Sequence, residues 1–178
     1  MKPNPLPSID RVNELLSYDA ETGLFSWKID RNWNSKAGSR AGSLRRDGYI
    51  GLKIDGERLL AHRVAWLVVN GTDPLVIDHA DGDRSNNSIR NLRDGTHSEN
   101  CANSKKRKAA KNPFKCVQWR EKDSKWQARI CVRGRRRSLG HFTTAEAAAA
   151  AYRVAALAEF GEYARFSSTD PNEYQEAA

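Results

Sequence analysis

Hydrophobic residues recur along the chain with two different periods, and these periods predict both helices and strands. A helix is predicted directly after Ser8, where four apolar residues follow helical spacing: Ile9, Val12, Leu15 and Leu16. Farther along, every second residue from Trp126 to Val132 is apolar, which is typical of a half-buried strand. The two periods in one chain predict a mixed α+β fold.

The amino-terminal half is predicted to contain short strands and one amphipathic helix. Its elements, in chain order, are a strand at 23–28, a hairpin of 49–54 and 57–61 around an Asp-Gly turn, and a helix that begins at His62. From Leu75 onward, the pattern indicates a strand, a long polar loop, a short strand and a helix that begins near Thr96.

The carboxy-terminal part has a different composition and a different pattern. Residues 104–112, SKKRKAAKN, carry almost no large apolar groups and are predicted to be a basic linker, with an extension of the preceding helix as the alternative. Three strands are predicted after the linker, at about 115–121, 126–133 and 136–140. Thr143 and Glu146 have the spacing of a capping box, and an alanine-rich helix is expected from there to about Gly161.

Residues 77–100, IDHADGDRSNNSIRNLRDGTHSEN, concentrate chemically active side chains. Asp78 and His79 are adjacent, so in an extended backbone their side chains point to opposite faces. This separation favours a carboxylate that binds a cation and an imidazole that moves a proton. Asn100, about one turn into the predicted helix, offers an amide oxygen, and hard divalent cations prefer oxygen ligands. The structural alternative is a turn built from Asp, Asn and Gly, with His79 as a surface residue.

The order DH, DGD, NN, NL and SEN resembles the HNH nuclease motif of phage homing endonucleases. The resemblance implies a ββα-metal fold in which His79 is the general base. It also implies that Asp78 and Asn100 bind one divalent ion, Mg²⁺ with Mn²⁺ as the alternative. Asn91 takes the central asparagine position, where it braces the loop and orients the histidine. Further candidates remain open: Asn87 as the rival to Asn91, His97 as a ligand or phosphate contact, and His62, for which a structural or phosphate-facing role is favoured over a catalytic one.

Charge is uneven along the chain. Residues 105–137 contain 14 Lys and Arg against Glu121 and Asp123, while the whole chain has a net charge of +8. Such a belt matches the phosphate charge of a nucleic acid duplex.

The three cysteines form no C-x-x-C pair, so reduced thiols in a cytoplasmic protein are expected. No apolar run is long enough to cross a membrane.

Residues 113–167 resemble the plant ethylene-response-factor domain of the Apetala-two type, through FKCVQWREKDSKWQARI, RRSLGHFTTAEAAAAAY and AEFGEYARF. The resemblance implies a three-stranded antiparallel sheet that enters the DNA major groove, with a helix packed behind it. The positions carried over as DNA contacts are Lys115, Gln118, Arg120, Lys125, Arg129 and Arg136. Alternation along the strand independently places Gln127, Arg129 and Arg133 on one exposed face. Cys116, Gln118, Arg129, Cys131 and Ser138 depart from the family's usual residues, so the family's target sequence does not transfer.

Together these features predict an HNH nuclease domain at 1–103, a basic linker at 104–112, a DNA-binding domain at 113–167 and a tail at 168–178. The expected function is metal-dependent hydrolysis of a phosphodiester bond in double-stranded DNA, by a monomer of phage or prophage origin that nicks or cuts at a specific site. The alternative is a DNA-binding regulator that carries a decayed nuclease domain. RNA binding ranks lower, because the major groove of an A-form duplex is too narrow for a sheet.

Overall fold

The computed structural model describes residues 4–33, 35–104 and 112–166. Most of the predicted linker, and the predicted tail at 168–178, lie outside the described residues. The chain divides into two compact units, Met1–Asp94 and Gly95–Ala178. The division falls before the helix that begins near Thr96, so this helix has its contacts in the second unit. The end of the nuclease domain at residue 103 stays a prediction.

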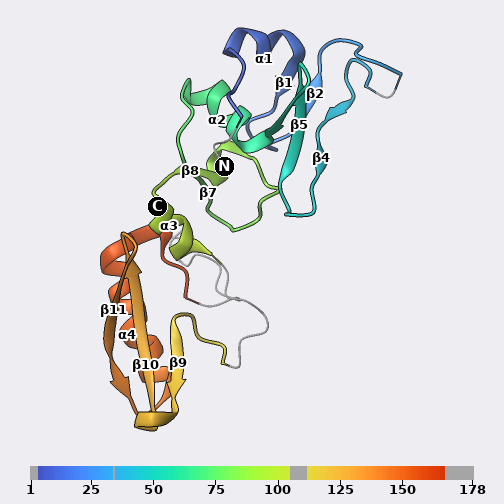
Figure 1. Ribbon diagram of the computed structural model, residues 1–178. Helices are drawn as coiled ribbons and strands as arrows, with labels where there is room; N and C mark the ends of the chain where they lie inside the picture. The colour runs from blue at the N-terminus through green and yellow to red at the C-terminus, as the bar shows by residue number, and fades with distance from the viewer. Residues whose placement is uncertain (1–3, 34, 105–111, 167–178) are drawn as a thin grey trace. The chain divides into compact units, whose positions relative to one another are not determined.

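The first unit contains small antiparallel sheets and two helices (Figure 1). Its elements are α1 (Ile9–Leu15), β1 (Leu16–Tyr18), β2 (Phe25–Trp27), β3 (Arg40–Ala41), β4 (Ser43–Leu44), β5 (Ile50–Ile54), β6 (Glu57–Leu60), α2 (Ala61–Asn70), β7 (Ile77–His79), the 3₁₀ turn η1 (Ile89–Asn91) and β8 (Leu92–Asp94). The strands form three sheets, in the orders β1-β2-β3, β4-β5-β6 and β7-β8.

One hydrophobic core joins the elements of this unit. Helix α1 begins after Ser8, whose side chain accepts a hydrogen bond from the Arg11 amide, and it buries Val12 and Leu15. Helix α2 buries Val64 and Ala65 against the same core. Because α2 follows β6 without a connecting loop, its first turn is held directly against the β5–β6 hairpin.

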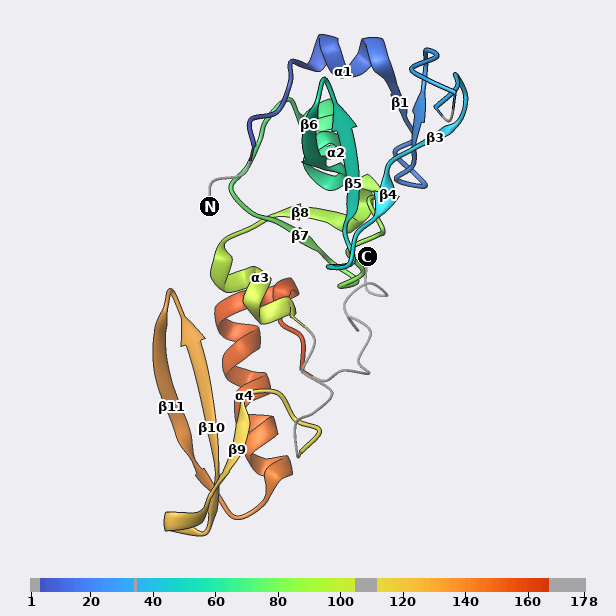
Figure 2. The same cartoon turned by 45° about the vertical axis from the view of Figure 1, so that its right-hand side comes forward.

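The second unit is a three-stranded sheet with a long helix along one face (Figure 2). Its elements are α3 (His97–Asn103), β9 (Val117–Arg120), η2 (Glu121–Asp123), β10 (Lys125–Val132), β11 (Arg135–Phe142), α4 (Ala145–Phe160) and η3 (Gly161–Tyr163). The antiparallel strand order is β11-β10-β9. Small side chains on α4, among them Ala148 and Ala156, are fully buried, and this allows the helix to lie close to the sheet.

The mixed α+β prediction is confirmed, as are most of the predicted elements. The predicted start of α4 was wrong by one residue: Thr144 is the N-cap, and its hydroxyl accepts a hydrogen bond from the Ala147 amide. The predicted alternation along β10 is confirmed, since its four apolar residues all belong to the core of the second unit: Trp126, Ala128, Ile130 and Val132. The register shift opposite Ala128 and Arg129 leaves the extra residue, Leu139, on β11. A bulge of this kind changes which side chains of the bulged strand share a face.

Candidate active site

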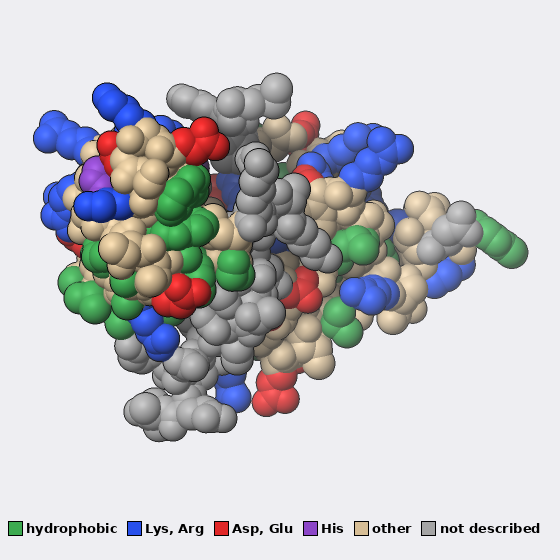
Figure 3. Space-filling model, turned by 90° about the horizontal axis from the view of Figure 1, so that it is seen from below, with side chains coloured by type: hydrophobic (Ala, Val, Ile, Leu, Met, Phe, Trp, Pro, Cys, Tyr) green, Lys and Arg blue, Asp and Glu red, His purple; other side chains and the backbone are tan. Residues whose placement is uncertain are grey.

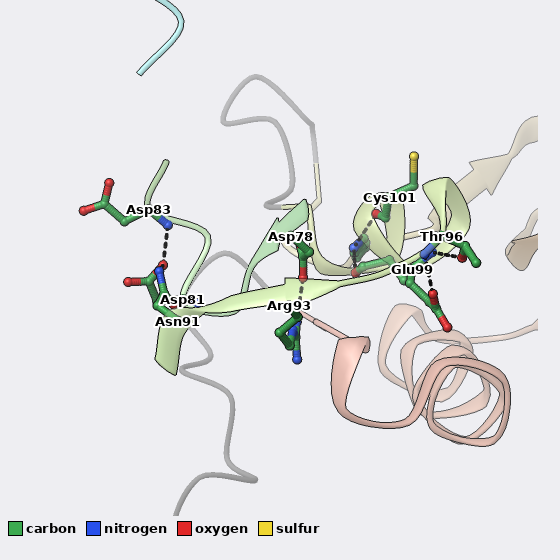
Figure 4. Close-up of polar contacts among 10 residues, drawn as sticks. Asp78, Asp81, Asp83, Asn91, Arg93, Thr96, Glu99 and Cys101 are labelled. Atoms are coloured by element: carbon green, nitrogen blue, oxygen red, sulfur yellow. Dashed lines mark hydrogen bonds and ion pairs between the residues drawn. The ribbon is translucent and has the colours of Figure 1, made fainter. Parts of the chain in front are cut away.

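Asp78 and His79 lie on the β7–β8 ribbon, in the first unit. Asp78 stands directly opposite Arg93 in the strand register, and Arg93 Nη2 donates to Asp78 Oδ2 at 2.7 Å (Figure 4). The Asp78 carboxylate is only 3% exposed. The pairing with Arg93 was not predicted, although an antiparallel ribbon makes a cross-strand partner of the opposite charge a general expectation.

The imidazole of His79 is buried and is held by an asparagine of the loop between β7 and β8. His79 Nε2 lies 3.3 Å from Asn87 Oδ1, while Asn87 Nδ2 donates to the carbonyl of Ser85. The second bond identifies the amide atom facing the histidine as the oxygen, so Nε2 carries the hydrogen and Nδ1 the lone pair. In this tautomer, Nδ1 is the ring nitrogen that is able to accept a proton.

Two aromatic rings pack against the ring of His79. The ring of His62 on α2 packs edge-on against the ring of His79, with centroids 5.1 Å apart, and the ring of Tyr49 lies 5.9 Å from that of His79. Desolvation by burial lowers the pKa of His79, and it lowers that of His62 to about 3. Both imidazoles are therefore neutral near neutral pH. His62 was a predicted candidate, whereas Tyr49 was missed, because no local spacing relates it to the motif.

The loop between β7 and β8 is braced by Asn91. Its side-chain nitrogen donates to Asp81 Oδ1 and to the carbonyl of Asn86, and its oxygen accepts from the Asp81 amide (Figure 4). The sequence expectation gave Asn91 two tasks, bracing the loop and orienting the histidine. The contacts divide these tasks: Asn91 braces the loop, and Asn87, the rival candidate, contacts His79.

Two residues far from this loop in the sequence hold Asn87 in place. Tyr18 donates its hydroxyl hydrogen to the carbonyl of Asn87 at 2.8 Å. A Cβ added to Gly23 would lie 2.2 Å from the amide nitrogen of Ser88 and 2.3 Å from the carbonyl carbon of Asn87. Gly23 is therefore required both for its positive φ of 72° and for this close approach. Neither residue could be connected to the site from the sequence.

Helix α3 carries the last predicted site residues, in the second unit. Thr96 and Glu99 form a capping box at its first turn (Figure 4). Asn100 is half-buried, and His97 is exposed with Nε2 3.8 Å from Cys101 Sγ. Asp78 and Asn100, the two predicted metal ligands, thus belong to different units.

The predicted cation has a chemically suitable donor in each of these two residues. A carboxylate has about four lone-pair positions, so the hydrogen bond from Arg93 does not by itself prevent Asp78 from coordinating a cation. An amide oxygen, a carboxylate oxygen and waters form the kind of set that Mg²⁺ accepts. Among the described residues, no group of three or more His, Cys, Asp and Glu side chains could hold a metal ion. By their chemistry, a carboxylate oxygen and an amide oxygen suit a hard cation better than zinc.

The residues predicted to contact DNA through the sheet of the second unit do not all reach its surface. Gln118, Lys125, Arg133 and Arg136 are exposed, and Arg120 and Arg129 are half-buried. Figure 3 shows Lys and Arg side chains projecting from the surface of this unit, at the left of the view. Three of the predicted residues line one hollow of about 260 Å³: Gln118, Arg129 and Arg136.

Two residues in that set are buried instead, and their expected exposure was wrong. The ammonium group of Lys115 donates to the carbonyls of Cys101, Ala102 and Ser104, at the end of α3. Gln127 lies on the central strand, where its side-chain nitrogen donates to Ser138 Oγ at 3.1 Å. Both side chains bond within the protein, which removes them from the surface open to DNA.

The β7–β8 ribbon, its buried histidine and the capped helix that follows occur in the order that the motif requires. Residues 59–102 match the family model of the HNH endonucleases. The matched HNH region runs from β6 through α2 and the ribbon into α3, and it includes every predicted residue of the catalytic set. The match supports a nuclease that acts on DNA. Comparisons with curated proteins and with solved structures found no match. No helix in the described part of the chain is long and apolar enough to span a membrane.

Proposed function

We propose that this protein is a metal-dependent endonuclease that hydrolyses a phosphodiester bond in double-stranded DNA. The observation that carries the proposal is the buried His79 whose Nε2 faces Asn87 Oδ1, within the matched HNH region. A proton acceptor needs a neutral ring, and the contact with Asn87 and the lowered pKa of His79 support this role. We further propose that the cleavage is site-specific and of the homing type, with either one strand nicked or both strands cut.

In the proposed mechanism, His79 Nδ1 accepts a proton from the attacking water, while Asn87 keeps the ring in place. Asp78 and Asn100 would hold the divalent cation, which supplies positive charge to the phosphate during the reaction. Arg93 orients the Asp78 carboxylate through its 2.7 Å hydrogen bond. Asn91 keeps the loop that carries Asn87 folded.

The direct test is cleavage of a supercoiled plasmid by the full chain with Mg²⁺, compared with the same reaction in EDTA. We expect nicked or linear product with Mg²⁺ and none with EDTA, and we expect Mn²⁺ to restore cleavage after the chelator is removed. Equal cleavage in EDTA would refute the metal dependence. A linear duplex with each strand labelled separately distinguishes the two modes. Cleavage of both labelled strands at one site would identify double-strand cutting.

The second unit is proposed to bind the duplex through its sheet. Replacement of Arg136 or Arg129 by Ala should weaken binding by about 1–3 kcal/mol if either guanidinium pairs with a guanine edge. The control is Arg153→Ala, which removes an exposed cation from α4 in the same unit. Fluorescence anisotropy with a labelled duplex measures the affinity, and single-turnover cleavage at saturating enzyme measures the chemistry. A loss of turnover with unchanged affinity would contradict this division between the units.

One observation favours the alternative, a DNA-binding regulator without cleavage. Asp78 is buried in an ion pair with Arg93, and a paired carboxylate in that position can be purely structural. The two functions differ in a single readout: the regulator binds DNA and gives no cleavage with any divalent cation. The plasmid assay therefore separates them.

A further inference from the structure

A second concentration of positive charge lies in the first unit, and its residues are separate in the sequence from the basic belt of residues 105–137. A hollow of about 950 Å³ is lined by residues of β2 to β6 and of the loop after β2. Six of the lining side chains are cationic, and among the described residues no acidic side chain lines the hollow. These six are Arg31, Arg40, Arg45, Arg46, Lys53 and Arg58. One of the six, Arg45, forms an ion pair with Asp47 Oδ2 at 2.9 Å.

Two of these cations face each other without a neutralising partner. Lys53 and Arg58 are directly opposite in the register of β5 and β6. Like charges at such positions destabilise a sheet. Among the described residues no carboxylate forms an ion pair with either side chain, nor with Arg40 or Arg46. An unbalanced cluster of this kind is explained if an anion lies over it when the protein acts.

The side chains that form the hollow are held in defined positions. The Arg31 guanidinium lies over the ring of Trp27, 4.5 Å from its centroid, and donates to the carbonyl of Lys53 at 2.6 Å. The Arg45 side chain crosses β5 at Gly51, where an added Cβ would lie 3.2 Å from Arg45 Cδ. Glycine inside a strand weakens it, and a close approach is the usual reason for its presence. Here the approaching group is an arginine of the hollow.

A short turn connects the hollow to the candidate active site. Arg45 and Arg46 begin the turn between β4 and β5, and the Arg45 amide donates to the carbonyl of Tyr49. The ring of Tyr49 in turn lies beside that of His79. Arg84, from the loop of the active site, donates to the carbonyl of Asp47 in the same turn and lies over the Tyr49 ring. A phosphate chain that passes His79 can therefore continue onto these arginines.

We propose that this hollow is a second DNA-binding surface, which holds backbone phosphates of the duplex on one side of the bond that is cut. The inference rests on the proposed endonuclease function and adds to it a contact made by the nuclease unit itself. A duplex carries one phosphate charge per about 1.7 Å of its axis, so several cations spread over a hollow of this size can be engaged together. The contact is with the backbone, and it gives affinity without sequence preference.

The experiment compares two double variants of the full chain that lose the same charge. Arg46→Gln with Arg58→Gln removes two unpaired cations of the hollow, and Arg11→Gln with Lys28→Gln removes two exposed cations of the same unit that do not line it. Binding to a labelled DNA duplex is measured in EDTA over a series of salt concentrations. For the hollow variant, the slope of log affinity against log salt should become smaller by about 1.8, since each lost phosphate contact contributes about 0.9. The control should keep the wild-type slope.

The outcomes separate the two proposals. Equal slopes for the two double variants would overturn the hollow as a DNA-binding surface and leave the nuclease proposal standing if the wild type still cleaves with Mg²⁺. A wild type that binds no duplex would overturn both. The inference would also be overturned if the hollow variant had a smaller salt slope than the wild type with duplex RNA but the same slope with duplex DNA. The single variant Arg46→Gln should give about half the change in slope, and thermal unfolding verifies that each variant is folded.

Discussion

Replacement of His79 by Ala is expected to reduce the rate of DNA cleavage by roughly 10²- to 10⁴-fold, the contribution typical of a positioned proton acceptor. The reason is that the imidazole of His79, held by Asn87 Oδ1, is the proposed proton acceptor. His62 is close, but its own buried ring packs edge-on against His79 and does not replace it. The rate is measured by single-turnover cleavage of a labelled duplex with Mg²⁺ at saturating enzyme.

Two further variants separate the chemistry from folding and binding. His79→Gln keeps a polar side chain that can reach Asn87 but cannot accept the proton, so it should be as inactive as His79→Ala. His141→Ala removes an exposed histidine of β11 in the other unit and should cleave at the wild-type rate when the enzyme is saturating. Duplex affinity of the His79 variants should stay within a few-fold of the wild type. Full cleavage by His79→Ala would disprove the role of this residue.

Replacement of Gly23 by Ala is expected to destabilise the first unit by about 3 kcal/mol, which lies at the upper end of ordinary single substitutions. The new methyl group would lie 2.2 Å from the backbone of Ser88, so backbone rather than a flexible side chain would have to move. That backbone carries Asn87, and its displacement should also reduce cleavage by weakening the hold on His79. Urea unfolding measures the stability, and cleavage is assayed where the variant is fully folded.

Gly56→Ala is the matched control for the steric effect. Gly56 also has a positive φ, of 90°, but a Cβ at this position meets no atom within 4 Å. It should therefore show only the backbone cost of about 1 kcal/mol for alanine in this region, with cleavage unchanged. If both variants lost the same stability, the close approach of Gly23 to Ser88 would not be the cause.

Local patterns were sufficient for most of the secondary structure. The helical spacing after Ser8, the Asp-Gly turn and the Thr96–Glu99 pair each act over a few residues, so their physical effect is visible in the sequence. The start of α4 was misplaced by one residue because Thr143 and Thr144 are both good N-caps. Which of the two caps the helix depends on the path of the backbone between the end of β11 and the start of α4.

Exposure of individual polar residues was less predictable, because it depends on neighbours that are distant in the sequence. Gln127 was expected to be exposed on one face of β10, but its side chain is buried and its nitrogen donates to Ser138 Oγ of the neighbouring strand β11. Lys115 was expected at the DNA surface, but three carbonyls at the end of α3 accept its hydrogen bonds. Carbonyls at a helix end lack partners within the helix, and a lysine from another segment satisfies them here.

The amino-acid sequence by itself determined the α+β class, the approximate positions of most helices and strands, and the motif that contains His79, since these depend on periodicity and on the types of neighbouring residues. Only the tertiary structure decided which asparagine holds the histidine, which arginine pairs with Asp78, and that six cations of the first unit line one hollow. Each of these depends on strand register and on contacts between distant segments. Such contacts form only when the chain folds, and for this reason no local pattern encodes them.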